Sequence, residues 1–396
     1  MTNNLKWCQV DTNTATREEI QAEIERLVSM KDLHMNAEQA IKIFINSVYG
    51  ACGSPWFAFF NLDVAEAVTL QGQDLIKYSE KIVNRYFLEF WHKDFKIHEK
   101  LGLTRVERIE KPVVIYCDTD SNFVSFKEIL DKCDWQGTPK AFILTVYRTF
   151  LKDYLEKCYE IYAKNFNTVN YQEFELEKIS DAGIWLAKKK YVYDTVWKDG
   201  VGDGIDVEPM TDIVAKGVEI VQSSTPKFVR EALKNLMKYI FVKKKDFSIS
   251  EFAGLLKKYK EEFQLKNIED ICMSSSIGDY EKHVLMDKDK IVLEKGCPIH
   301  VRAAAVYNHA LYNSKYKRKY QPIFTGEKVK WYMVKSPRGE ENVYAFISGS
   351  FPVELAPPLD YDAQFNRCIV APINRFIEAM GFSAVSPQLV VSNQLF

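Results

Sequence analysis

The stretch VVIYCDTDSNFVSF, residues 113–126, places two aspartates between two apolar runs that have the composition of β-strands. A chain that reverses between two such runs predicts an antiparallel hairpin. Asp118 and Asp120 fall at its turn. Desolvating one carboxylate is costly, and two neighbouring carboxylates also repel each other, so a positive group is expected beside them. The rest of the chain has to indicate what that group is.

The composition is that of a globular protein with balanced charge. The 396 residues are 47% hydrophobic and 27% charged, and the formal net charge is −1. At roughly 150 residues per domain, this length predicts two or three domain-sized units. Because 53 Lys and Arg nearly cancel 54 Asp and Glu, any nucleic-acid partner has to be held by local basic patches.

The cysteine and hydropathy patterns exclude several classes of protein. The 8 cysteines form no CxxC pair, which argues against a zinc ribbon or a disulfide framework and favours reduced thiols. The first residues lack the basic and then apolar pattern of a signal peptide. No uncharged apolar run is long enough to span a bilayer. We therefore expect a cytoplasmic protein with no membrane partner.

Hydrophobic periodicity predicts an α+β chain. Helices are expected over residues 16–31, 36–50, 63–90, 139–163, 223–245, 251–263, 302–320 and 372–380. The second of these should begin at Asn36, with Gln39 completing a capping-box pair. Besides the hairpin, strands are expected over residues 174–179 and 189–197, with further β-like sequence after residue 320. A boundary is expected near residues 200–215, where a glycine-rich loop precedes a more basic, helical composition.

Lys42, Asn46 and Tyr49 are spaced i, i+4 and i+7, so they share one face of the second expected helix. The opposite side carries three apolar residues: Ile41, Phe44 and Val48. We expect that apolar side to pack and the polar side to face a cleft or solvent. A lysine ammonium suits phosphate oxygens, and a tyrosine one turn farther offers a flat face to a base or sugar. On spacing alone, an ordinary amphipathic helix also explains the pattern.

Five segments resemble, in order and spacing, signatures of family B DNA polymerases, in particular the replicative enzymes of T-even phages. KIFINSVYG (42–50) resembles the KxxxNSxYG signature of the fingers helix, and YCDTDS (116–121) resembles the catalytic DTDS turn of the palm. AKKKY (187–191) is similar to the KKRY element. Two further segments resemble parts of the thumb: VQSSTPKFVREAL (221–233) and KGCPIHVRAAAVYN (295–308). The resemblance covers the chain from about residue 36 to its end.

The resemblance implies template-directed DNA synthesis, in which a primer 3′-hydroxyl attacks the α-phosphate of a dNTP. Two Mg²⁺ ions about 4 Å apart would stabilise the attacking and leaving oxygens. Asp120 matches the carboxylate that bridges the metals, Asp118 matches a neighbour with a lesser part, and Glu177 aligns with a palm carboxylate near the metals. Taken alone, the DTDS tetrapeptide is also typical of an Asx-rich hairpin turn.

The resemblance also implies contacts with nucleotide and DNA. Lys42 would pair with the triphosphate, while Asn46 and Tyr49 would line the nascent base-pair pocket. The basic element near the active site consists of Lys188, Lys189, Lys190 and Tyr191. On the expected strand, alternate lysines face opposite ways, so that not all of them could contact one DNA backbone. A solvated charged face also explains this lysine cluster.

In the thumb region, tyrosines recur every fourth residue among basic side chains. The tyrosines are Tyr312, Tyr316 and Tyr320, and the basic residues are Lys315, Lys317, Arg318 and Lys319. Basic residues in this pattern would bind backbone phosphates without regard to base sequence. Core packing of a helical stripe explains the tyrosines as well.

The domains implied by the resemblance are a C-terminal part of the fingers (1–58), a palm with an antiparallel sheet (59–212) and a mostly helical thumb with a C-terminal tail (213–396). The family's DxxSLYP motif, with its essential metal carboxylate, is absent from this sequence, as are the exonuclease motifs. The chain would therefore hold one side of a two-metal site. We expect an N-terminal polymerase chain to supply the missing carboxylate and the exonuclease, unless the sequence is a fragment.

The last residues, SPQLVVSNQLF, resemble loosely the tail by which phage polymerases bind a sliding clamp, although a frayed terminus fits equally well. Such an enzyme would work in the cytoplasm of a phage-infected cell on primer–template DNA. A non-catalytic DNA-binding or scaffolding remnant of a polymerase is the alternative, but a pure binder has no use for paired aspartates. A metal-dependent nuclease would need further acidic motifs.

Overall fold

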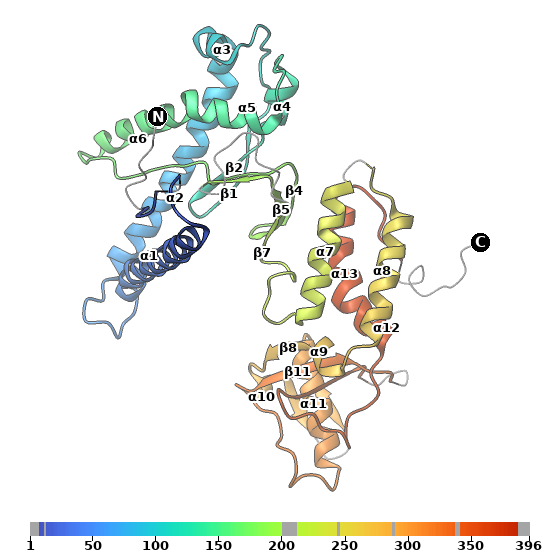
Figure 1. Cartoon of the computed structure of the whole chain (residues 1–396). Coiled ribbons are helices and arrows are strands. Elements are labelled where there is room, and N and C mark those ends of the chain that lie inside the picture. The colour runs from blue at the N-terminus through green and yellow to red at the C-terminus, as the bar shows by residue number, and fades with distance from the viewer. Residues whose placement is uncertain are drawn as a thin grey trace. The chain divides into compact units, whose positions relative to one another are not determined.

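The computed structural model describes residues 8–11, 13–199, 212–243, 246–286, 290–336 and 341–386. The chain divides into two compact units (Figure 1), which we call unit 1 and unit 2. Unit 1 comprises Met1–Gln136 and Arg148–Glu173, and unit 2 comprises Gly137–Tyr147 and Phe174–Phe396. Helices alternate with small sheets whose described strand pairs are all antiparallel, which confirms the α+β prediction.

Unit 1 is mostly helical. Its helices are α1 Arg17–Cys52, α2 Leu62–Arg85, α3 Phe95–Leu101, α4 Lys127–Asp131 and α6 Lys152–Asn165. A π-helical turn, η1 Tyr86–Phe90, and a 3-10 turn, η2 Trp91–Lys93, continue α2 toward α3. The hairpin of β1 Val114–Asp118 and β2 Ser121–Val124 lies beside α2. The predicted helix over 63–90 and the predicted hairpin are thus confirmed.

The helix α1 is continuous, so the predicted break before Asn36 is wrong. The segment KDLHMN, residues 31–36, contains neither Gly nor Pro, and an interior Asn costs less than about 0.7 kcal/mol relative to Ala. The true N-cap is Thr16, whose side chain accepts a hydrogen bond from the Glu19 backbone N–H while the Glu19 side chain accepts one from the Thr16 backbone N–H. That capping box begins a helix that continues through Gly50 and ends at Cys52, just before Gly53.

The packing predicted for the apolar side of α1 is also wrong for the described part of this chain. Ile41, Phe44 and Val48 are 60%, 69% and 47% exposed. Glu23 is the one residue that α1 buries. The amphipathic pattern is real, but the surface that it predicts has no partner in unit 1.

Unit 2 begins with two small antiparallel sheets. Its strands are β3 Lys178–Ile179, β4 Gly183–Ala187, β5 Lys190–Thr195, β6 Trp197–Lys198 and β7 Asp212–Lys216. β3 pairs with β6, and β4, β5 and β7 form the second sheet in that order. The helix α5 Pro139–Val146 packs Leu144 against Ile179 and Trp197 of the first sheet. The turn η3 Tyr147–Leu151 then leads to α6, so the predicted helix over 139–163 is present with a π-helical interruption.

The remainder of unit 2 is helical with two further sheets. Its longer helices are α7 Lys227–Lys243, α8 Ile249–Gln264, α11 Ile299–Tyr312 and α13 Ala371–Ala379. Short helical segments are α9 Ile268–Ile271, α10 Tyr280–His283, α12 Tyr361–Phe365 and η5 Asn366–Val370. The strands are β8 Met273–Ser276, β9 Val284–Met286, β10 Ile291–Leu293, β11 Lys328–Met333 and β12 Val343–Ile347. They form the sheets β12–β11–β8 and β10–β9.

One hydrophobic core runs through unit 2. It extends from Val192 on β5, through the buried faces of α7, α8 and α11, to Val385 near the end of the described chain. Asn308 is a buried polar residue in this core, and its side chain bonds the Tyr280 hydroxyl and both backbone groups of Ile323. Because that side chain is satisfied, α11 can be buried along its length.

The predicted helix over 302–320 ends early, at Tyr312. The Ser314 hydroxyl donates to the Leu311 carbonyl and accepts from the Tyr316 N–H, so it takes the place of helical hydrogen bonds. Tyr316 and Tyr320 therefore lie outside any helical stripe with Tyr312. Among the described residues, no helix combines the length and apolar composition needed to cross a membrane. The glycine-rich loop predicted near residue 200 falls outside the described residues.

Candidate active site

The acidic turn is a two-residue connection between β1 and β2. Asp118 pairs with Ser121 in the ladder, which leaves Thr119 and Asp120 as the loop. Thr119 has φ = 61°, a left-handed conformation that costs a β-branched residue on the order of 1–3 kcal/mol. A short turn of this kind favours Gly where Thr119 stands, so the strain indicates that this turn is held by its surroundings.

Three hydrogen bonds fix the turn internally. The Asp120 N–H donates to the Asp118 carbonyl at 2.7 Å, and the Ser121 hydroxyl donates to the same carbonyl at 3.1 Å. The Thr119 hydroxyl donates to Asp118 Oδ1 at 3.1 Å. Asp118 is buried and Asp120 is exposed, so Asp120 is the carboxylate presented to a ligand.

The helix α2 positions the hairpin. Asn84 Oδ1 accepts hydrogen bonds from the backbone N–H groups of Val113 and Val114, at 2.9 and 3.0 Å. On β2, the Asn122 amide donates to the buried Ser79 hydroxyl at 2.7 Å. The same helix contacts α1, so α2 connects the hairpin to the helix that carries Lys42.

The two carboxylates suit a hard cation as part of its ligand set. Mg²⁺ is commonly bound through one or two carboxylates together with substrate phosphates and water. Within the part of the chain that the structure describes, no group of three or more His, Cys, Asp or Glu side chains could hold a metal. Burial, with a contribution from Glu80, raises the pKa of the Cys117 thiol, so the neighbouring sulfur is not a competing thiolate ligand at neutral pH.

Glu177 belongs to unit 2, whereas the acidic turn belongs to unit 1. It immediately precedes β3, so the predicted strand over 174–179 is confirmed only at its last two residues. The Glu177 carbonyl accepts a hydrogen bond from the Asp199 N–H at 3.0 Å. Its carboxylate is close enough to Tyr193 to add to the burial that raises the pKa of that phenol to about 12.

Lys42, Asn46 and Tyr49 lie on one face of α1, as predicted, and all three are exposed. The neighbouring Ser47 hydroxyl donates a hydrogen bond to the Ile43 carbonyl of the same helix at 2.6 Å. None of these three side chains forms a hydrogen bond or an ion pair with a residue that the structure describes.

Two of the three lysines form a turn, and the third begins β5. Ala187 pairs with Lys190 across the β4–β5 hairpin, so Lys188 and Lys189 form its two-residue loop. The prediction that alternate lysines face opposite ways is therefore wrong, because residues in a tight turn do not alternate as strand residues do. Lys188, Lys189 and Lys190 are all exposed, whereas Tyr191 is buried and stacks with Tyr193.

Gly217 supports this lysine turn, and sequence analysis missed it. Its φ is +67°, and a Cβ at this position would lie 1.9 Å from the Lys189 carbonyl oxygen. Lys189 itself has φ = 60°. Only a glycine lets the chain after β7 approach the turn this closely. In the sequence, Gly217 is a lone glycine in a segment for which no element was predicted. The support from Asn84 and Ser79 can be seen only in the tertiary fold.

The basic residues of the predicted thumb surface lie in the turns after α11. Lys315, Lys317 and Arg318 are exposed. Lys319 differs from them, because its ammonium and the Tyr320 hydroxyl both bind the Glu354 carboxylate. That pairing holds the pKa of Glu354 at about 2 and leaves Lys319 less free to bind a phosphate.

Comparison with known proteins gives a consistent result. A family model described as DNA polymerase family B matches residues 10–135 and 142–380. The DNA-directed DNA polymerase of Escherichia phage RB69 is 28% identical over 369 residues, covering 87% of this chain and 37% of the relative. That of Enterobacteria phage T4 is 26% identical over 364 residues, covering 86% of this chain and 36% of the relative. DNA polymerase 1 of Aeropyrum pernix is 24% identical over 268 residues, covering 67% of this chain and 21% of the relative.

The chain thus spans a little over a third of the length of the phage relatives that it matches.

Proposed function

The chain belongs to DNA polymerase family B, as its five segments predicted, and on that premise we propose that it performs template-directed DNA synthesis as part of a phage-type replicative polymerase. The observation that carries the proposal is the acidic turn. The buried Asp118 ends β1, and the exposed Asp120 lies in the strained two-residue loop of the hairpin that α2 holds in place.

The proposed role of the turn is to hold Mg²⁺ through Asp120 and, to a lesser extent, Asp118. When bound, the metal would activate the primer hydroxyl and offset charge on the leaving pyrophosphate. The Thr119 hydroxyl orients the Asp118 carboxylate, and the hydrogen bonds at the Asp118 carbonyl keep Asp120 at the exposed end of the loop. Glu177 is proposed as a further carboxylate near the metals.

The proposed contacts with nucleotide and DNA come from α1 and from two basic elements. Lys42 would bind the triphosphate, and Asn46 and Tyr49 would line the pocket for the base pair. All three share one exposed face, which supports their acting as a unit. The exposed turn at Lys188–Lys190 and the basic residues Lys315, Lys317, Arg318 and Lys319 are proposed to bind the DNA backbone.

We also propose that a second polypeptide segment, corresponding to the N-terminal part of the polymerase, completes this site. Two observations support it: the acidic turn offers two carboxylates, and the apolar side of α1 is uncovered in unit 1. The added segment would bring the missing carboxylate and the exonuclease. The proposed clamp-binding tail lies at residues 387–396, outside the described residues, so its role stays a prediction.

Primer extension with the N-terminal segment present tests the proposal. Asp120→Asn should reduce the extension rate at least about 100-fold, because metal ligation contributes several kcal/mol to the transition state. Asp153→Asn is the matched control, since Asp153 is an exposed aspartate of the same unit on α6, and its rate should stay within twofold of wild type. If Asp120→Asn retains the wild-type rate, the catalytic role is wrong.

The contact proposed for Lys42 has its own test. Lys42→Ala should lower both the extension rate and the affinity for dNTP, because the ammonium would bind the triphosphate in the ground state and would also offset the charge that builds on the leaving pyrophosphate in the transition state. Lys31→Ala, an exposed lysine on the same helix, is the control. Kinetics within twofold of wild type for Lys42→Ala would remove this residue from the nucleotide site.

A further inference from the structure

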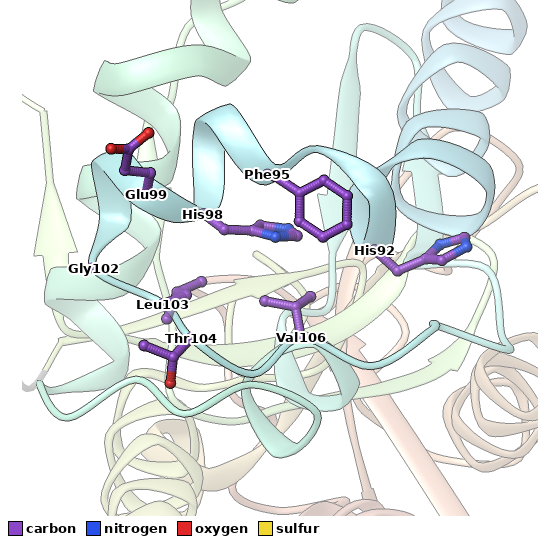
Figure 2. Close-up of a pocket in the computed structure, with 8 residues that line it drawn as sticks. All are labelled: His92, Phe95, His98, Glu99, Gly102, Leu103, Thr104 and Val106. Atoms are coloured by element: carbon purple, nitrogen blue, oxygen red, sulfur yellow. The ribbon is translucent and has the colours of Figure 1, made fainter.

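Unit 1 contains a cavity of about 430 Å³ that the acidic turn does not line (Figure 2). It lies between α3 and the segment over residues 102–106, and its wall includes Phe95, His98, Leu103 and Val106. This segment leads toward the start of β1 at Val114, whereas the acidic turn follows the other end of that strand. Five extended residues separate the two ends by about 17 Å. The cavity is therefore a second feature of unit 1.

The wall of the cavity is fixed by hydrogen bonds. At the end of α3, the Leu103 N–H donates to the His98 carbonyl at 2.9 Å, and Gly102 takes φ = 69° to allow the turn. The Thr104 N–H then donates to Asp134 Oδ1 at 3.1 Å, and the Glu107 N–H donates to the Lys132 carbonyl at 2.9 Å. Because both ends of the segment are bonded, the cavity is formed before any ligand arrives.

His98 presents a hydrogen-bond acceptor to this cavity. His98 is only 6% exposed, and its Nε2 lies 2.7 Å from the Trp91 carbonyl oxygen. A carbonyl can only accept, so Nε2 carries a proton, and in the neutral imidazole Nδ1 is then the acceptor. No described residue forms a hydrogen bond with Nδ1, and Figure 2 shows the ring between Phe95 and Val106. A ligand that fits this cavity should offer an N–H or O–H donor.

Phe95 provides a flat surface at the rim. The residue is 75% exposed, and its ring stands edge to face with that of His98, with centroids 6.0 Å apart. An exposed aromatic ring beside a cavity is the usual platform on which single-stranded nucleic acids stack a base. The size of the cavity also falls within the range of about 300–1,000 Å³ that ligand sites occupy.

The helix α3 also carries two cations that suit phosphates. Lys96 and Lys100 are exposed at i and i+4 on α3, next in sequence to the cavity-lining Phe95 and Glu99. Neither lysine has an ion pair with a described carboxylate, in contrast to Lys132, which pairs with two glutamates. Glu99 is an acceptor at the same rim and would repel a phosphate placed inside the cavity. The phosphates of a ligand should therefore lie outside, along α3.

We propose that this cavity binds one unpaired base of single-stranded DNA. The base stacks on Phe95 and donates an amino hydrogen to His98 Nδ1, while the neighbouring phosphates contact Lys96 and Lys100. A strand is favoured over a free nucleotide because the cations extend along α3 and do not line the cavity. The choice of DNA rests on the function proposed above, whereas the stacking site rests on the geometry of unit 1.

Photo-cross-linking of the full chain to a short oligodeoxycytidylate containing 5-iodocytosine tests the proposal, because this base retains its amino group. Mass spectrometry should place the adduct on a peptide within residues 92–106. Phe95→Ala should abolish that adduct and weaken binding of the oligonucleotide about fivefold or more. Phe59→Ala is the matched control, since Phe59 is 76% exposed in the same unit, and it should change neither result.

The role of the base's amino group as hydrogen-bond donor is tested without altering the protein. An oligonucleotide built from 2-pyrimidinone, which lacks the amino group, should bind the wild-type chain several-fold more weakly than oligodeoxycytidylate. The proposal is overturned if adducts form only outside residues 92–106, if Phe95→Ala binds within twofold of wild type, or if free dCMP blocks cross-linking at the concentration of the oligonucleotide. A chain that cross-links at this site but gives no primer extension with its N-terminal segment contradicts the proposed polymerase function and leaves this site intact.

Discussion

The helices α1 and α11 differ in what surrounds them. α1 has 36 residues and buries only Glu23. α11 has 14 residues and buries half of them: Val301, Ala303, Ala304, Ala305, Tyr307, Asn308 and Leu311. Helices in proteins gain most of their stability from tertiary packing. The described residues of unit 2 therefore pack α11 on one side, whereas the described residues of unit 1 leave α1 largely uncovered.

The apolar residues of α1 show what is missing. Ile41, Phe44, Ile45 and Val48 are spaced i, i+3, i+4 and i+7, which is the pattern of a helix that packs along one side. All four are exposed. The pattern in the sequence thus anticipates a packing partner beyond the described residues, and the proposed N-terminal segment of the polymerase would be that partner.

The same substitution in both helices should give the largest contrast. Leu311→Ala removes a side chain that is 1% exposed and leaves a cavity, so the free energy of unfolding of unit 2 should fall by about 2–5 kcal/mol. Leu33→Ala on α1, where the leucine is 67% exposed, should change stability by less than about 0.5 kcal/mol. Urea unfolding measures both. Equal losses would mean that α1 is packed in the isolated chain.

A glycine in each unit extends the comparison. Gly217→Ala places a Cβ against the Lys189 carbonyl in a left-handed conformation, and the strain alone should cost on the order of 1–3 kcal/mol. Gly50→Ala on α1 meets nothing within 4 Å and should stabilise that helix by up to about 1 kcal/mol. Thermal unfolding should show the loss of stability in Gly217→Ala, and helical circular dichroism should show the gain in helix stability in Gly50→Ala. A destabilising Gly50→Ala would show that α1 has a close neighbour there.

The smallest effect concerns the one buried residue of α1. Glu23 accepts hydrogen bonds from the Arg26 guanidinium and the Gln9 N–H, and these hold its pKa at about 2. A folded-state pKa below the ordinary value of 4.5 means that this contact stabilises above pH 4.5 and is lost as the pH falls toward 2.

Hydrogen exchange of the Gln9 amide should therefore stay slow from pH 7 to about 4, after correction for intrinsic exchange, and lose its protection near pH 2. Glu23→Ala removes the acceptor and should therefore expose the Gln9 amide at every pH. A protection factor that is unaffected by Glu23→Ala would show that other contacts hold residue 9 against α1.

Local patterns were sufficient to predict much of this fold. The apolar runs on either side of DTDS predicted the β1–β2 hairpin, and helical periodicity predicted α2, α7, α8 and α13. Helix boundaries were less predictable. Asn36 resembles a cap but sits inside α1, and Ser314 ends α11 through hydrogen bonds to its own neighbours. In both cases a polar residue had two local options, and sequence alone did not decide between them.

The candidate site was predictable where it depended on order along the chain. Asp118 and Asp120 do lie together, and Lys42, Asn46 and Tyr49 do share a face. Lys188 and Lys189 lie in a turn because β4 pairs with β5, and β4 was not predicted. The close approach of Gly217 to this turn is a tertiary feature that local sequence patterns do not show. The strain at Thr119 was likewise invisible, since nothing in the sequence marks a positive φ at a threonine.

The most direct test of the account is the primer-extension rate of this chain as a function of the concentration of a polypeptide that carries the N-terminal part of the polymerase. The rate should rise from near zero to a plateau, and a chain with both Asp118→Asn and Asp120→Asn should stay near zero at every concentration. Full activity of this chain alone, or a plateau that survives the double substitution, would contradict the account.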